Sequence, residues 1–72
     1  MSKNNINSNL VLKSAIEQIP LRIRRAKKRQ KDLAVAAGTS EAHLSQILNF
    51  VIKAPRLNMM NNIEKALQDW GV

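Results

Sequence analysis

The chain has 72 residues, no cysteine, one tryptophan, one phenylalanine and a formal net charge of +7 from 12 basic and 5 acidic side chains. The length suits one domain near the lower limit for a self-sufficient core, and the absence of cysteine excludes disulfides and thiolate metal sites. The charge favours a polyanionic partner, but so few aromatic side chains disfavour the stacking platforms of RNA and single-strand binders; the expected partner is double-stranded DNA.

Several function classes are disfavoured by what the sequence lacks. No apolar run approaches the roughly 18 residues of a membrane span, and the first residues, Met-Ser-Lys-Asn-Asn, have no apolar signal region. We therefore expect no membrane association and a cytoplasmic location. With one histidine and scattered acids we expect no metal or cofactor, and without an acid pair or a nucleophile–base set we expect no catalytic residues and no enzyme.

Residues 1–9 are expected to form a disordered N-terminal tail. They contain four asparagines, two serines and a lysine around one isoleucine, which is too little apolar surface to bury. Residues 10–72 are then expected to form a single domain.

A helix is expected over residues 10–27. Its apolar positions recur in steps of three or four residues at Leu12, Ala15, Ile16, Ile19, Ile23 and Ala26. This phase continues past Pro20, although a proline in a helix interior removes one hydrogen bond and costs about 3 kcal/mol. Either one helix is kinked at Pro20 or two segments meet there; the unbroken phase favours a kinked helix or two nearly coaxial segments.

Residues 22–31 form a basic segment that spans the end of this helix and the start of the next. The segment contains Arg22, Arg24, Arg25, Lys27, Lys28, Arg29 and Lys31. Charge runs usually serve only as a solvated face. Here the run directly precedes the motif described next, which favours contact with DNA phosphates; such contacts set register on the duplex without reading sequence.

Residues 30–49 carry the motif around which the domain is expected to form. The apolar face of a first short helix, residues 30–37, consists of Leu33, Ala34 and Ala37. The apolar face of a second helix consists of Leu44, Ile47 and Leu48. Between them, Gly38 suits a helix end that needs a positive φ, and Ser40 can cap the second helix. This order predicts a helix-turn-helix, whose second helix can enter a DNA major groove.

The motif resembles a known family of regulators. It is similar to the Cro/repressor-type (Xre-like) helix-turn-helix of phage and bacteria in the pattern Gln30-x-x-Leu33-Ala34-x-x-Ala37-Gly38-Thr39-Ser40, then Leu44-Ser45-x-Ile47. The family's next helix is matched in type and spacing by Pro55-x-Leu57 and Ile63-x-x-Ala66-Leu67. The similarity covers about residues 21–70. It implies an all-α fold, a compact four- to five-helix bundle of the lambda-repressor-like helix-turn-helix type.

Two looser resemblances accompany it. The phage CII-type activators are similar in Ser14-Ala15-Ile16, in Pro55-Arg56-Leu57-Asn58-Met59 and in the ending Asp69-Trp70-Gly71-Val72. The small phage modulator-of-repression proteins look like Cro relatives but act on a repressor. A phage-encoded chain would work in the host bacterial cytoplasm.

The resemblance also implies which residues meet DNA. Base edges would be met by Ser40, Glu41, Ala42, His43 and Gln46, with Asn49 on the same outward face. The expected backbone contacts are Arg22, Arg25, Lys27, Lys28, Arg29, Gln30, Lys31 and Thr39. Gln46 can pair with adenine and Ala42 can touch a thymine methyl group, whereas Glu41 can accept from cytosine but is costly in a negative groove. His43 could donate to guanine or phosphate, with an ordinary exposed histidine as the alternative.

One residue departs from the family pattern. Members usually have Ser, Thr or Asn as the N-cap before the glutamine, where this chain has Arg29. A cation beside a helix N-terminus is mildly unfavourable, and Asp32 in the first turn acts in the favourable direction.

Residues 50–54, Phe-Val-Ile-Lys-Ala, begin with three large apolar residues where the family usually has a polar, glycine-containing loop. Either Phe50 or Ile52 is expected to fill the core, because a core this small cannot bury three large apolar residues in a row. The remainder would form a contact patch for a protein partner, together with Glu41; this candidate surface consists of Glu41, Phe50, Val51 and Ile52.

The last helix is expected over residues 56–69, opened by Pro55 and stopped by Gly71. Its core stripe is Leu57, Met60, Ile63, Ala66 and Leu67. Family members often continue into a fifth helix used for dimerisation. This sequence ends before such a helix, so a homodimer stays an open expectation.

Two functions follow as hypotheses. The favoured one is a small phage-type transcription regulator that binds duplex DNA through the helix-turn-helix, with the basic segment gripping the backbone. The alternative is an antirepressor that binds the DNA-reading face of a partner phage repressor and blocks operator binding.

Overall fold

Four helices make up the described residues: α1 (Ser2–Arg25), α2 (Gln30–Ala37), α3 (Glu41–Leu48) and α4 (Leu57–Asp69). The computed structural model describes residues 2–52 and 54–72, and their side chains from Leu12 onward. No strand occurs in this part of the chain, so the all-helical expectation is confirmed. Within the described residues, no helix is long and apolar enough to cross a membrane.

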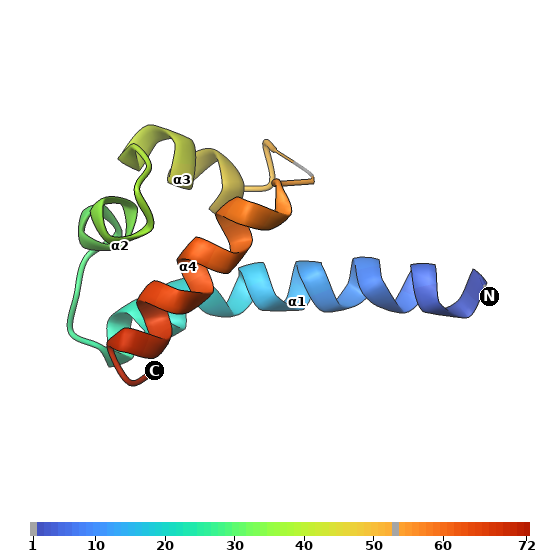
Figure 1. Cartoon of the computed structure of the whole chain (residues 1–72), viewed down its shortest axis with the longest axis horizontal. Coiled ribbons are helices and arrows are strands. Elements are labelled where there is room, and N and C mark those ends of the chain that lie inside the picture. Colours follow the sequence, from blue (N-terminus) through green and yellow to red (C-terminus); the bar gives the residue numbers. More distant parts are fainter. Residues whose placement is uncertain (1, 53) are drawn as a thin grey trace.

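The helices pack around α2. It contacts α4 most extensively, then α3 and α1, and α3 also contacts α1. Figure 1 shows α1 as one long helix, with α4 crossing near its C-terminal end and with α2 and α3 lying to the same side. In the short pair α2–α3, α2 therefore packs against both α1 and α4, and α3 packs against α1.

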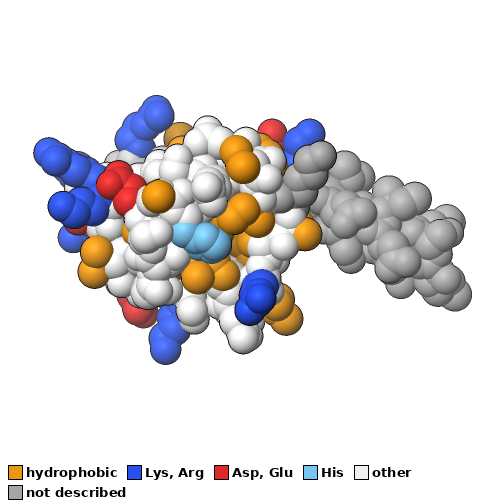
Figure 2. Space-filling model, turned by 90° about the horizontal axis from the view of Figure 1, so that it is seen from above, with side chains coloured by type: hydrophobic (Ala, Val, Ile, Leu, Met, Phe, Trp, Pro, Cys, Tyr) orange, Lys and Arg blue, Asp and Glu red, His pale blue; other side chains and the backbone are white. Residues whose placement is uncertain are grey.

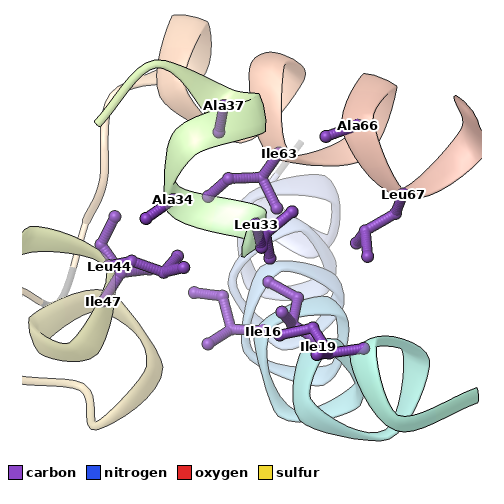
Figure 3. Close-up of a cluster of buried hydrophobic side chains, with 11 residues drawn as sticks. Ile16, Ile19, Leu33, Ala34, Ala37, Leu44, Ile47, Ile63, Ala66 and Leu67 are labelled. Carbon is purple, nitrogen blue, oxygen red and sulfur yellow. The ribbon is translucent and has the colours of Figure 1, made fainter. Parts of the chain in front are cut away.

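The core contains one set of apolar side chains drawn from all four helices (Figure 3). Its fully buried members are Ile16, Ile19, Leu33, Leu44, Ile47, Ile63 and Leu67. Ala34 and Ala37 are buried as well, and their small side chains let α2 approach its neighbours closely. No polar side chain is buried among the described residues. The buried residues of α1, α2 and α3 follow the helical phase predicted for those segments, and in α4 Ile63, Ala66 and Leu67 do so.

Helix α1 is continuous through Pro20, which decides between the two alternatives left open above. Pro20 itself is exposed, and the carbonyl that loses its helical donor there is that of Ile16, which is only 1% exposed. The helix begins at Ser2, not near Leu10. Residues 2–9 continue the α1 backbone, because extending a formed helix is far easier than nucleating one. The disordered tail expected over residues 1–9 stays a prediction.

All four helices end in the same way. In α2 the N–H of Gly38 donates to the carbonyl of Val35 at 3.1 Å, and that of Thr39 to Ala34 at 2.9 Å. This pair of bonds is the Schellman motif, which needs one residue in the left-handed region. The residues that occupy this position are Lys27 (φ 57°), Gly38 (φ 74°), Phe50 (φ 59°) and Gly71 (φ 78°). The predicted roles of Gly38 and Gly71 are confirmed.

Two expectations about the second half of the chain need correction. Leu57 is 74% exposed and does not belong to the core stripe of α4, because it is the first helical residue; Ile63, Ala66 and Leu67 form the buried part. Phe50 and Ile52 both pack against the core without being fully buried, so neither alone fills it. Val51 between them is 68% exposed.

Candidate nucleic-acid interface

Helix α3 separates its residues into a buried and an outward side. Leu44 and Ile47 are fully buried and fix the helix against the core. The outward side, called the α3 ridge below, is formed by the exposed residues Glu41, Ala42, Gln46 and Asn49. Because the anchoring side chains allow the helix no rotation without exposing them, the ridge has one fixed orientation.

The start of α3 is capped as expected. The hydroxyl oxygen of Ser40 accepts a hydrogen bond from the backbone N–H of His43 at 3.1 Å. Ser40 has extended backbone geometry, as an N-cap requires. Glu41 lies in the first turn, where its charge is favourable toward the helix dipole. Ser40 therefore has a structural task in addition to any contact with a base.

Asn49 closes the other end of α3. Its side-chain amide donates to the backbone carbonyl of Ser45 at 2.9 Å and to the Ser45 hydroxyl at 3.1 Å. A bidentate contact with adenine needs both the amide nitrogen and the amide oxygen. In this conformation only the oxygen is left, so Gln46 is the ridge residue equipped for that contact.

His43 does not lie with the ridge. It is partly buried and lines a groove between α3 and α4. Of the residues expected to meet bases, Glu41, Ala42 and Gln46 are exposed, whereas His43 is partly buried and lines the groove.

The first turn of α2 is stabilised without a capping side chain at Arg29. The backbone N–H of Arg29 donates to Asp32 Oδ2 at 2.9 Å, which is the returning half of a capping box. Because Asp32 supplies this bond, the family's usual Ser, Thr or Asn can be replaced by arginine here. The Arg29 side chain makes no capping bond and is exposed.

Most of the predicted phosphate-contacting residues are accessible. The exposed cations are Arg25, Lys27, Lys28, Arg29 and Lys31, whereas Gln30 and Thr39 are partly buried. Figure 2, viewed from the α3 side, shows Lys and Arg side chains gathered at the end of the molecule where α2 and the α1–α2 connection lie. The cations therefore border the face that carries α3.

Arg24 joins this group, although it was not in the predicted set. With Lys28 and Gln30 it lines a pocket of about 250 Å³ beside the start of α2. Two cations and a side-chain amide around one hollow can hold a phosphate group. Arg24 could not be distinguished from its neighbours by sequence, since the choice depends on how the α1–α2 turn directs each side chain.

The prediction that Arg22 contacts DNA phosphate needs correction. Its guanidinium forms a bidentate pair with the Glu64 carboxylate at 2.7 Å for both bonds, and also donates to the backbone carbonyl of Val72 at 2.7 and 3.2 Å. The side chain is only 20% exposed. Its donors are thus used inside the molecule, where they join α1 to α4 and to the segment after α4. Arg22 is therefore not a phosphate contact in this structure.

This pair shifts both pKa values. Hydrogen bonding from Arg22 lowers the pKa of Glu64, with partial burial opposing the effect and the charge of Arg22 adding to it. The same hydrogen bond raises the pKa of Arg22. Both shifts favour the charged forms. We call Arg22, Glu64 and the Val72 carbonyl the Arg22 clamp.

A second long-range contact involves the basic segment. The ammonium of Lys28 lies 5.8 Å from the centre of the Trp70 ring, within the range of a cation–π interaction. Lys28 remains exposed, so its charge is positioned by Trp70 and still accessible.

Other kinds of site find no support in these residues. The described part of the chain contains no group of three or more His, Asp or Glu side chains that could hold a metal ion.

Comparisons with protein-family models, curated proteins and solved structures gave no match to this chain. Function is therefore inferred from the residues of the chain itself.

Proposed function

We propose that this protein is a small transcription regulator that binds duplex DNA through a helix-turn-helix of the lambda-repressor-like type, formed by α2 and α3. The observation that carries the proposal is the division of α3 into a fully buried anchor, Leu44 and Ile47, and the exposed α3 ridge, which carries one carboxylate, one methyl and two amide side chains. A helix held in this way can lie in the major groove, which is about 12 Å wide, without leaving its core.

The ridge offers chemistry that distinguishes base pairs. Gln46 can bind adenine with its amide nitrogen and oxygen, and Ala42 can contact a thymine methyl group. Glu41 can accept a hydrogen bond from cytosine, at an electrostatic cost in the groove. The preferred site would then combine A·T pairs opposite Ala42 and Gln46 with a G·C pair opposite Glu41.

Backbone contacts come from the exposed cations beside α2. Arg25, Lys28 and Lys31 support this assignment because they are accessible and border the face that carries α3. A phosphate can also be held in the hollow lined by Arg24, Lys28 and Gln30. These contacts supply affinity for any duplex, and the ridge supplies the preference among duplexes.

The test begins with selection of preferred duplexes from a random pool, followed by affinity measurements on a selected and a scrambled duplex. Gln46→Ala should weaken binding to the selected duplex alone, by about 1–3 kcal/mol. Arg25→Ala should weaken binding to both duplexes alike. Lys13→Ala is the matched control, since Lys13 is an exposed cation on α1 that belongs neither to the basic segment nor to α2 or α3. An equal loss on both duplexes for Gln46→Ala would contradict the placement of α3.

The antirepressor function is kept as the second candidate because of Glu41 and Val51. Glu41 is exposed and, among the described residues, takes no part in an ion pair, and Val51 offers an exposed apolar contact. An acidic side chain suits the basic DNA-reading face of a partner repressor better than it suits DNA.

One substitution separates the two candidates. Glu41→Lys replaces an acid by a base at the ridge, so a DNA-binding protein should gain affinity for every duplex. An antirepressor carrying the same change should no longer prevent its partner repressor from binding operator DNA. If Glu41→Lys still inhibits operator binding by the repressor as well as the unchanged protein does, the antirepressor function is contradicted.

A further inference from the structure

A groove of about 540 Å³ lies between the start of α3, the α3–α4 connection and the first turns of α4. Its apolar lining includes Ile52, Pro55 and Met59. Its polar lining includes His43, Arg56 and Asn62. Figure 2 shows the histidine among hydrophobic side chains on this face. The volume falls within the usual range for sites that bind a ligand or an inserted side chain.

Among the described residues, the ionisable side chains that line the groove are those of His43 and Arg56, and no carboxylate lines it. Arg56 is exposed and makes no hydrogen bond to cap α4, so its guanidinium is available to an occupant. A carboxylate group therefore fits the groove better than a cation does.

The apolar lining argues against DNA phosphate as that anion. Ile52, Pro55 and Met59 would be left in contact with a strongly hydrated group, at a cost in apolar surface that stays wet. Two exposed apolar residues also adjoin the lining residues in sequence, Val51 next to Ile52 and Leu57 next to Arg56. An occupant that buries such surface must itself be partly apolar.

We propose that this groove binds an acidic segment of a partner protein, one that inserts a bulky apolar side chain against Met59 and Ile52 and places a carboxylate beside Arg56. The groove differs from the α3 ridge in its lining, because none of the ridge residues Glu41, Ala42, Gln46 and Asn49 lines it. Partner and DNA can then occupy neighbouring faces of α3.

The experiment starts from a displayed library of random 12-residue peptides selected on the full chain. Enriched peptides should carry Asp or Glu next to Leu, Ile, Phe or Trp. One enriched peptide is then synthesised with a fluorophore and its affinity measured by anisotropy at constant salt. Enrichment of basic peptides, or of peptides without a large apolar residue, would overturn the proposal.

Variants locate the binding. Arg56→Glu should lower the affinity of the peptide by roughly tenfold or more, since like charges would face each other. The helix should tolerate this change, because an acid at the N-terminus of α4 favours the helix dipole. Lys65→Glu is the matched control, with the same change of charge on the same helix outside the groove, and should have a much smaller effect.

Further outcomes are decisive. Met59→Lys, with its fold checked by circular dichroism, should also abolish the peptide complex, whereas Gln46→Ala should leave it unchanged. Equal losses for Arg56→Glu and Lys65→Glu would mean general charge attraction and would overturn the proposal. So would self-association in sedimentation that Arg56→Glu removes, because the groove would then belong to a second copy of the chain.

Discussion

At the scale of single residues, the left-handed positions at the helix ends make the clearest predictions. Gly38 has φ 74°, and a Cβ added there would meet no atom within 4 Å. The cost of a side chain at this position is therefore conformational and not steric with neighbours. Gly38→Ala should lower the free energy of unfolding by about 1 kcal/mol, as measured by chemical denaturation. An unchanged midpoint would mean that the turn does not need this geometry.

Lys27 should respond in the opposite direction. It occupies the same kind of position with φ 57° and is exposed, so its side chain contributes no burial in return for the strained backbone. Lys27→Gly should raise the free energy of unfolding by up to about 1 kcal/mol. If Lys27 also contacts phosphate, the same variant should bind all duplexes more weakly. A less stable variant would contradict the argument.

Phe50 is the informative contrast to Lys27. Its φ is 59°, but its ring packs against the core, so glycine would relieve the backbone and lose apolar burial at once. We expect Phe50→Gly to destabilise the protein in the denaturation assay that shows Lys27→Gly to be stabilising. A gain in stability would mean that the ring contributes little to the core.

At the scale of elements, the Arg22 clamp joins α1 to α4. Glu64 has a lowered pKa in the folded protein, so the clamp contributes stability above the ordinary glutamate value of about 4.3 and loses it as pH falls through the lower folded value. The Tm measured by thermal denaturation should therefore decline as the pH is lowered from 6, and Glu64→Gln should make this decline smaller. Glu17→Gln, which removes an exposed carboxylate on α1, is the control and should leave the decline in place.

The local elements could be predicted because their signals lie within a few residues of one another. The bounds of α2, the turn at Gly38 and the cap at Ser40 each depend on side chains that act on the adjacent backbone. The start of α1 was wrong for the same reason. The residues before Leu10 have no apolar pattern of their own, whereas a helix already formed downstream can extend through them.

Contacts between distant elements could not be predicted in this way. Arg22 meets Glu64 across 42 positions of the sequence, and in the sequence Arg22 looks like the other cations of its run. The pairing of Lys28 with Trp70 likewise depends on how the end of α4 lies beside the α1–α2 connection. The groove beside His43 was missed because its lining comes from α3, the connection and α4 together. The DNA-reading role of the ridge stays a prediction.

At the scale of the whole molecule, charge and apolar surface are divided between neighbouring faces. The exposed cations lie around the start of α2, and the apolar groove lies between α3 and α4. With a net charge of +7, the protein should attract duplex DNA from any direction and orient on it through the cations beside α2. The groove would remain at the side of the complex for a protein partner.

The most direct measurement is the affinity for duplex DNA as a function of salt, by fluorescence anisotropy. The logarithm of the association constant should fall linearly with the logarithm of salt concentration. Arg25→Ala and Lys28→Ala should each reduce the slope by about one unit, and Lys13→Ala should not. An absence of salt-dependent duplex binding tighter than about 0.1 mM, the weak end of ordinary non-specific affinity, would contradict DNA binding as the function.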